Sequence, residues 1–343
     1  MRAAETADQA DPQYSSSSRA HSYIPQTDTH SVKTAGMAGG NPKGGEPGDG
    51  VSNKGWCLRM IKDEFRCSNF GLSHPTPRLL VSDQWGYPRL YVGWRVVCAL
   101  YHLAWIVYNW SDDASRDERR TGAWLVYLTN WTFLLLTVNT LILAVVVVYV
   151  RCSAQNFPDG AGSPWYLKAS WVVYTIASVG SIMVTVLFFG LLFSGSLSPV
   201  SGETHLGNSV YVLLDLCVTA MPVRLLHVIY PAVYALVYCM FTVVYWAAGG
   251  TTSSGETFIY KPLDWNRAQV AVPLVIGAAF VGVPLVHLIF WSLYMLRLTL
   301  NRHCCGEGEK SGRVVLNGYD LNAEKGDHPT ASRPPSVNVI SPV

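Results

Sequence analysis

Charged side chains are scarce in this sequence, because Asp, Glu, Lys and Arg together make up only 14% of its 343 residues, whereas 50% are hydrophobic. A typical soluble domain has about 25% charged residues. The formal net charge is only +2, and the basic residues form short clusters beside apolar runs instead of one patch. This composition excludes an ordinary soluble domain and argues against a nucleic-acid partner.

Motifs for metals, cofactors and disulfides are also missing. The eight cysteines form no CxxC pair and show no His/Cys spacing of the zinc type. The sequence contains no Walker loop, dinucleotide fingerprint, HExxH pair or GxSxG elbow. We therefore expect no disulfide framework, no metal site and no cofactor.

What the sequence does have is a series of long apolar runs, most of them ended by Trp or Tyr, as expected of a membrane interface. They cover residues 91–108, 123–150, 167–193, 206–221, 226–248 and 270–298. A helix needs about 20 residues to cross a bilayer, so we expect an all-α, polytopic membrane bundle of about six transmembrane helices. The fourth run is short and carries Asp215 near its centre, which leaves a re-entrant segment as an alternative.

Four regions follow from this pattern. Residues 1–54 and 303–343 lack an apolar period, so we expect disordered cytoplasmic tails on either side of a transmembrane bundle at 91–302. The polar start of the chain carries no cleavable signal peptide, so the first transmembrane helix is expected to act as the targeting signal. At 55–90, Trp56, Met60, Ile61 and Phe65 recur at helical spacing among basic residues. This pattern predicts an interfacial amphipathic segment on the anionic leaflet.

With six transmembrane helices, both termini lie on the same side of the membrane. Lysine and arginine near the spans are more numerous on that side, which predicts that both termini are cytoplasmic. In that orientation the sequon at Asn109 faces the outside and is a candidate for glycosylation. Cysteines next to the membrane are candidates for palmitoylation, with unmodified thiols as the alternative. They are Cys57, Cys67, Cys304 and Cys305.

Polar residues inside a bilayer are costly, so they either bond neighbouring helices together or line a site. Thr129, Thr132 and Asn139 share one face of the second expected helix, and Asn208 and Asp215 share a face of the fourth. We expect Asp215 to be neutral or paired with a residue from another helix.

Two further pairs of residues are candidates, one for catalysis and one for binding lipid headgroups. The Thr129 hydroxyl could act as a nucleophile if a base took its proton, and His205 could be that base, whereas Asn208 could not. Arg224 and His227 are three residues apart on one helical face at the membrane boundary. They are expected to bind lipid headgroups or to serve a structural purpose.

Three segments occur in this order: SDQWG at 82–86, YLTNWTF at 127–133 and PVRLLHVIYP at 222–231. Together they resemble the rolling stone family of multi-pass membrane proteins over roughly residues 67–302. The resemblance implies a plasma-membrane protein of myoblast fusion in insects, with no settled molecular activity.

More distantly, the helical core is similar to the androgen-induced protein family, membrane hydrolases of fatty-acid esters of hydroxy fatty acids. That resemblance places the nucleophile of the family at Thr129 and puts Asn208 where the family has its catalytic His. Asn has no basic nitrogen, and loss of a general base costs about 100- to 10,000-fold in rate.

We therefore expect a non-enzymatic protein of the rolling stone type that acts in cell-cell fusion or membrane organisation. An intramembrane Thr-dependent lipid-ester hydrolase is the alternative, and a channel or transporter is a third reading, based on Asp215 and the polar stripe of the second helix. The expected partners are the lipid bilayer, a lipid ligand and unidentified proteins.

Overall fold

The computed structural model describes residues 61–116, 123–153, 157, 160, 162–252 and 254–304. All of them belong to the compact unit Val51–Val343. The tails expected at 1–54 and 303–343 lie outside the described residues, except for the end of the last helix. Trp56, Cys57 and Met60 lie outside them as well.

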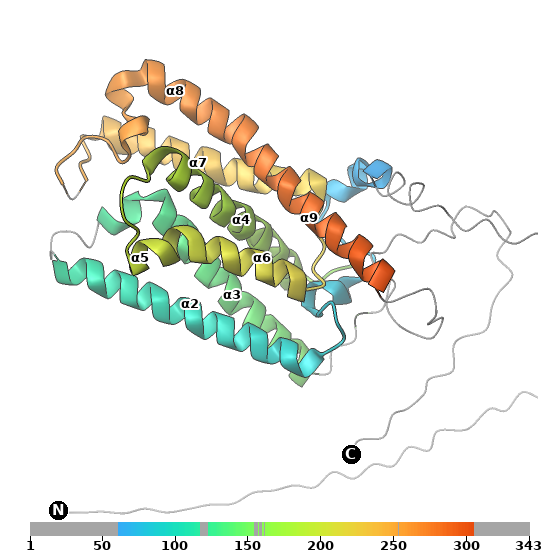
Figure 1. Cartoon of the computed structure of the whole chain (residues 1–343). Helices are drawn as coiled ribbons and strands as arrows, with labels where there is room; N and C mark the ends of the chain where they lie inside the picture. The colour runs from blue at the N-terminus through green and yellow to red at the C-terminus, as the bar shows by residue number, and fades with distance from the viewer. Residues whose placement is uncertain are drawn as a thin grey trace, which may run out of the picture. The chain divides into compact units, whose positions relative to one another are not determined.

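The described chain folds into helices that run back and forth along one bundle (Figure 1). The first two long helices are α2 (Pro88–Arg116) and α3 (Leu128–Cys152). They are followed by α4 (Trp165–Leu187), which continues into the π-helix η5 (Phe188–Leu192). The next rod joins α5 (Pro199–Gly202), η6 (Glu203–Gly207) and α6 (Asn208–Val218). The last elements are η7 (Leu225–Val228) with α7 (Ile229–Ala247), and then α8 (Ala268–Gly277), η10 (Ala278–Gly282) and α9 (Val283–Cys304).

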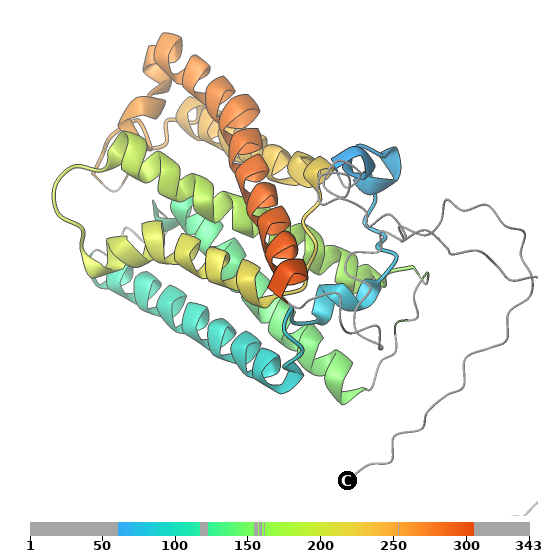
Figure 2. The same cartoon turned by 45° about the vertical axis from the view of Figure 1, so that its right-hand side comes forward.

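By length and composition, 5 helical stretches can cross a membrane. They are Pro88–Asp112, Leu128–Cys152, Trp165–Leu192, Leu225–Ala247 and Trp265–Asn301. The remaining helical segment is continuously helical from Pro199 to Val218. At 1.5 Å per residue it is about 30 Å long. Its main part, α6, lies between α2 and α4 in both views (Figures 1 and 2). Its first half carries polar residues such as Glu203 and His205, which explains why the sequence showed only a short apolar run there. The all-α membrane bundle of about six helices is thus confirmed.

We call the end of the bundle where α2 begins and α9 ends the proximal end, and the opposite end the distal end. Residues 61–87 pack on the proximal end through two short 3-10 helices, Cys67–Phe70 and Pro77–Val81. The Trp85 indole donates a hydrogen bond to the Cys217 carbonyl at 2.9 Å, and an isolated bridge pairs Asp83 with Thr219. Of the expected amphipathic segment 55–90, residues 61–64 are helical, with Ile61 and Phe65 exposed.

The core lies on α3 and α4. Phe133, Leu136 and Leu143 of α3 and Trp171 of α4 are all 0% exposed. Small residues on α4 let neighbouring helices approach closely, as is usual inside membranes. Large apolar side chains such as Val145 point outward, where lipid tails can cover them.

The last rod differs from the others. The stretch Trp265–Asn301 has 37 residues, about 55 Å of helix, against about 30 Å of hydrocarbon. It contains Pro273 and a π-helical stretch at Ala278–Gly282, both of which commonly bend a helix. Figure 2 shows it crossing the other helices obliquely, and such a tilt lets a long helix fit the bilayer.

The difference between inward and outward positions on α3 gives a test. Leu143→Ala should lower the free energy of unfolding by about 2 kcal/mol or more, because it leaves a cavity at a side chain that is 0% exposed. Val145→Ala, at a residue that is 66% exposed, is the matched control and should change it little. Thermal unfolding of the purified protein in detergent measures both, and equal effects would contradict the assigned inward and outward faces.

Candidate functional site

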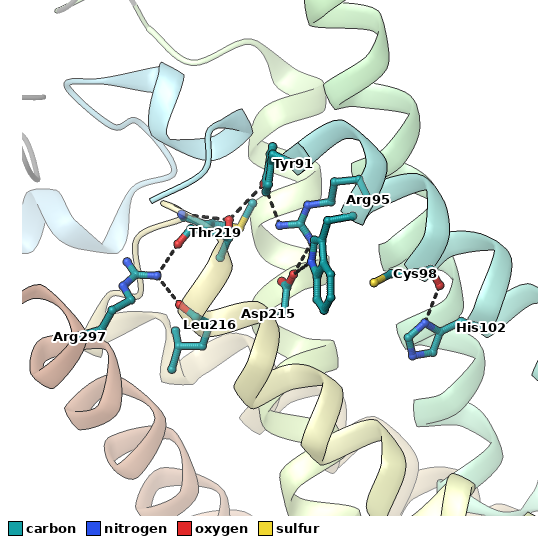
Figure 3. A network of polar contacts seen from close by, with 10 residues as sticks. Tyr91, Arg95, Cys98, His102, Asp215, Leu216, Thr219 and Arg297 are labelled. Atoms are coloured by element: carbon teal, nitrogen blue, oxygen red, sulfur yellow. Dashed lines mark hydrogen bonds and ion pairs between the residues drawn. The ribbon is translucent and has the colours of Figure 1, made fainter. Parts of the chain in front are cut away.

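A buried ion pair joins two helices near the proximal end (Figure 3). The Arg95 guanidinium of α2 lies 2.7 Å from the Asp215 carboxylate of α6, and each side chain is 1% exposed. The Trp94 indole donates to the same carboxylate oxygen at 2.8 Å. The partner that we expected for Asp215 on another helix is therefore Arg95.

Hydrogen bonds extend this pair towards α9. Arg95 donates to the Tyr91 hydroxyl at 2.8 Å, and that hydroxyl lies 3.2 Å from the Thr219 hydroxyl. From the other side, Arg297 of α9 donates to the carbonyls of Leu216 at 2.6 Å and Thr219 at 2.5 Å. These carbonyls at the end of α6, which have no partner within the helix, thereby accept hydrogen bonds from a cation. The positive charge also interacts favourably with the negative end of the helix dipole.

Arg224 and His227 form a second buried cluster. Arg224 is 7% exposed, donates to the carbonyls of Gly71 at 2.9 Å and Ser73 at 3.2 Å, and stacks its guanidinium over Trp171. The His227 ring packs against the edge of Trp171 at 4.6 Å. These contacts tie the segment 61–87 to the bundle and support the structural alternative for both residues over headgroup binding.

His74 belongs to the same cluster. Burial and the nearby positive charge of Arg224 lower the pKa of His74 to about 4, although its hydrogen bond with the Thr76 carbonyl acts in the opposite direction. Its ring also meets Trp171 edge-on at 5.9 Å. His74 is therefore neutral at pH 7, and its protonation would place a second positive charge beside Arg224.

An open cavity lies between α3, α4, α7 and the α8–η10 part of the last rod; together with the open space at its mouth it measures about 1000 Å³. Thr129 and Thr132 are part of its wall. The Thr132 hydroxyl lies 3.0 Å from the Tyr234 hydroxyl, and the Tyr260 hydroxyl interacts with Thr129. Asn139, on the same helix, is 1% exposed but is not part of the cavity wall.

The other two candidate catalytic residues lie elsewhere. The His205 ring stacks on Phe188 with centroids 3.7 Å apart, and the Asn208 amide donates to the Thr204 carbonyl at 3.1 Å. Phe188 lines the cavity, but neither His205 nor Asn208 does. In the described part of the chain, the structure does not bring Thr129, His205 and Asn208 together around one cavity.

The candidate modification sites are placed as follows. Asn109 is 9% exposed, and its side-chain oxygen accepts a hydrogen bond from the Trp124 indole at 2.7 Å. Cys67 is exposed. Cys57 and Cys305 lie outside the described residues, as does the side chain of Cys304. No group of His, Cys, Asp or Glu among the residues searched could hold a metal ion.

Sequence reasoning missed the functions of Arg95 and Arg297, which it counted as charges near the membrane surface. The sequence did indicate that Arg95 needs a partner, because it lies inside the apolar run 91–108 and an ionisable residue within a membrane is costly unless it is paired. Spacing alone could not have linked it to Asp215, which is 120 residues away.

The ion pair can be tested with a double-mutant cycle. Arg95→Met or Asp215→Leu alone should lower the free energy of unfolding by about 3–5 kcal/mol, because each leaves an uncompensated buried charge. The double variant should recover most of that loss. Chemical unfolding in mixed micelles measures the four proteins, and additive losses would show that the two residues act independently.

The segment 61–87 should loosen in acid. His74 titrates near 6.5 when unfolded and at about 4 when packed, so the loosened state binds more protons between these values. The stability of the packed segment should be full above pH 6.5 and fall as the pH drops towards 4. Hydrogen exchange of residues 70–76 measures it, and His74→Phe should weaken this pH dependence; an unchanged profile in the variant would show that another group is responsible.

Comparison with known proteins supports the resemblance found in the sequence. The family described as "Protein rolling stone" matches residues 54–306. Protein rolling stone of Drosophila melanogaster is 28% identical over 267 residues, which cover 71% of this chain and 92% of that protein. No solved structure matches the chain significantly. Since the match spans the segment 61–87 and the helical bundle, the chain belongs to the rolling stone family of membrane proteins.

Proposed function

We propose that this protein is a non-enzymatic plasma-membrane protein that acts in cell-cell fusion or in organising membrane contacts. The observation that carries the proposal is the separation of the candidate catalytic residues. Thr129 faces the cavity, whereas the ring of His205 is stacked on Phe188 and Asn208 offers no base. The resemblance to the rolling stone family implies a role in cell-cell fusion. A bundle in which the candidate nucleophile and the candidate base lie apart is consistent with such a non-enzymatic role.

An orientation with both termini in the cytoplasm accompanies this proposal. Arg95, Arg224 and Arg297 are buried and do not count as surface charges. Exposed basic residues are still present at the proximal end, namely Lys62, Arg66, Arg78, Arg89 and Arg151. At the distal end, the exposed ones among the described residues are Lys261 and Arg267. This imbalance supports a cytoplasmic proximal end.

Surface labelling tests location and orientation together. An epitope inserted at Ser115, at the distal end of α2, should be labelled by antibody in intact cells, whereas an epitope fused to the C-terminus should require permeabilisation. Labelling of the Ser115 epitope only after permeabilisation would contradict both the plasma-membrane location and the orientation.

A fusion assay tests the function itself. Cultured cells depleted of this protein should form fewer multinucleate cells than controls, and re-expression of the chain or of Thr129→Ala should restore fusion equally. Normal fusion without the protein would refute the fusion role, and rescue by the wild type but not by Thr129→Ala would refute the non-enzymatic part.

A lipid-ester hydrolase is the second candidate, because Thr129 lines an apolar cavity of the kind that could hold an acyl chain. A fluorophosphonate probe should then label the wild type and not Thr129→Ala. Thr137→Ala is the matched control, since the Thr137 hydroxyl donates to the Phe133 carbonyl of its own helix. Labelling of neither protein, or of both equally, would exclude this mechanism.

The modifications belong to the same proposal. Attachment of a glycan at Asn109 would place this residue on the outer side, and palmitate on Cys57, Cys67, Cys304 and Cys305 would strengthen membrane anchoring on the inner side. Digestion with an N-glycosidase and hydroxylamine-sensitive labelling with an alkyne palmitate analogue test the two modifications.

A further inference from the structure

Basic side chains gather where helices begin and end at the proximal end of the bundle. Arg89 lies in the first turn of α2 and Arg151 in the last turn of α3, and Figures 1 and 2 show these two helix ends side by side. Arg78 belongs to the 3-10 helix Pro77–Val81, which packs against α3 and α4, and Lys168 lies in the first turn of α4. The three arginines are exposed and Lys168 is half-buried. We call these four residues the basic rim.

The fold holds Arg78 in place beside α4. The His74 amide donates a hydrogen bond to the Ser163 hydroxyl at 3.3 Å, which joins the chain just before the 3-10 helix to the chain just before α4. Leu79 and Leu80 are buried under the same 3-10 helix, whereas Arg78 is on its exposed side. The position of this charge is therefore set by packing of the segment 61–87 on the bundle.

Acidic residues in the described part of the proximal end do not neutralise the basic rim. Asp63 and Asp215 form ion pairs with arginines outside the rim. The other two carboxylates, those of Glu64 and Asp83, accept hydrogen bonds from backbone amides. None of the four rim residues forms an ion pair with another described residue. Their positive charge is thus available to an anion from outside the described chain.

Aromatic side chains place the rim at the level of lipid headgroups. Tyr87 and Trp165 lie at the starts of α2 and α4 and are 63% and 79% exposed. Exposed Trp and Tyr side chains prefer the interface between hydrocarbon and water. Arg89 follows Tyr87 by two residues, and Lys168 follows Trp165 by three. Because side chains on a helix tilt towards its N-terminus and long basic side chains extend to the interface, both charges reach the headgroup layer.

The distal end is less suited to bind anions. Its exposed basic residues in the described part of the chain are Lys261 and Arg267. Arg267 lies 3.8 Å from the Asp264 carboxylate, so among these two only Lys261 lacks an ion-pair partner there. Attraction of anionic groups is therefore expected to be stronger at the proximal end.

We propose that the basic rim of Arg78, Arg89, Arg151 and Lys168 binds the headgroups of anionic phospholipids of the phosphatidylserine class. Such lipids carry their negative charge at the depth that the aromatic residues define, and each Lys or Arg near an anionic bilayer surface strengthens binding about fivefold. The inference adds a lipid partner to the proposed function. It does not depend on the fusion role, because binding is measured on the purified protein.

Retention of lipid by the full-length protein tests the proposal. The protein is purified in detergent with equal amounts of phosphatidylserine and phosphatidylcholine that have the same acyl chains, and native mass spectrometry counts the lipids that stay bound. Phosphatidylserine should be retained preferentially, because the two lipids differ in net charge and not in their tails. Equal retention of the two lipids would refute the proposal.

Variants locate the binding site. Arg78→Gln combined with Arg151→Gln removes two charges of the rim and should lower the preference for phosphatidylserine about fivefold per residue. Lys261→Gln combined with Arg267→Gln at the distal end is the matched control and should leave the preference unchanged. Equal losses in the two variants would show that net charge, and not the basic rim, attracts the lipid.

A second set of variants guards against misfolding. Arg89→Gln combined with Lys168→Gln repeats the comparison if the first rim variant does not unfold with the thermal transition of the wild type. Arg78→Lys combined with Arg151→Lys keeps both charges and should keep the preference for phosphatidylserine. An unchanged preference in folded Gln variants of the rim would refute the site.

Salt and a soluble competitor test the nature of the interaction. Raising the ionic strength from about 0.1 M to about 1 M shortens the Debye length from about 10 Å to about 3 Å, so the preference for phosphatidylserine should weaken. A preference that does not respond to salt would overturn the electrostatic basis. Glycerophosphoserine, the headgroup without acyl chains, should not displace the lipid at equal concentration. Full displacement would point to a site for free phosphate esters and would overturn the assignment to membrane lipid.

Discussion

The ion pair between Arg95 and Asp215 is the interaction on which the arrangement of the proximal end depends. Two opposite charges, each 1% exposed, are tolerable in a bilayer only if they stay together. Their helices therefore have one permitted register, whereas apolar contacts alone would allow neighbouring registers. Arg297 adds α9 to the same arrangement through the carbonyls at the end of α6, so three helices far apart in sequence are fixed at one point.

The second cluster also stabilises the proximal end of the bundle, but it does so through hydrogen bonds with backbone groups. Arg224 holds the carbonyls of Gly71 and Ser73, and the Glu64 carboxylate accepts a hydrogen bond from the Leu225 amide at 3.0 Å. The segment 61–87 thus supplies hydrogen-bond partners to backbone groups around the break between α6 and α7, such as the Ala220 and Leu225 amides, which would be costly to leave unpaired at membrane depth. Both clusters lie towards the proximal end, whereas the wall of the cavity includes residues towards the distal end, such as Thr129.

Much of the fold could be predicted from the sequence, because the bilayer makes apolar run length informative. The runs at 123–150 and 167–193 correspond closely to Leu128–Cys152 and Trp165–Leu192. The rod at 199–218 was less predictable, since the polar residues of its first half interrupt the apolar pattern. Partners such as Arg95 and Asp215 could not be deduced, because pairing over 120 residues depends on how the helices pack. The cavity also escaped sequence reasoning: Thr129 and Thr132 stood out, but the tyrosines of α7 resembled ordinary interfacial aromatics.

The lengths of the spans have a further consequence. The stretches Pro88–Asp112, Leu128–Cys152 and Trp165–Leu192 contain 25, 25 and 28 residues, about 37 to 42 Å of helix. The hydrocarbon core is about 27 Å thick in the endoplasmic reticulum and about 32–33 Å in sterol-rich plasma membranes. For these three spans, hydrophobic mismatch is therefore smaller in the thicker bilayer, and tilting takes up the remaining excess of helix length.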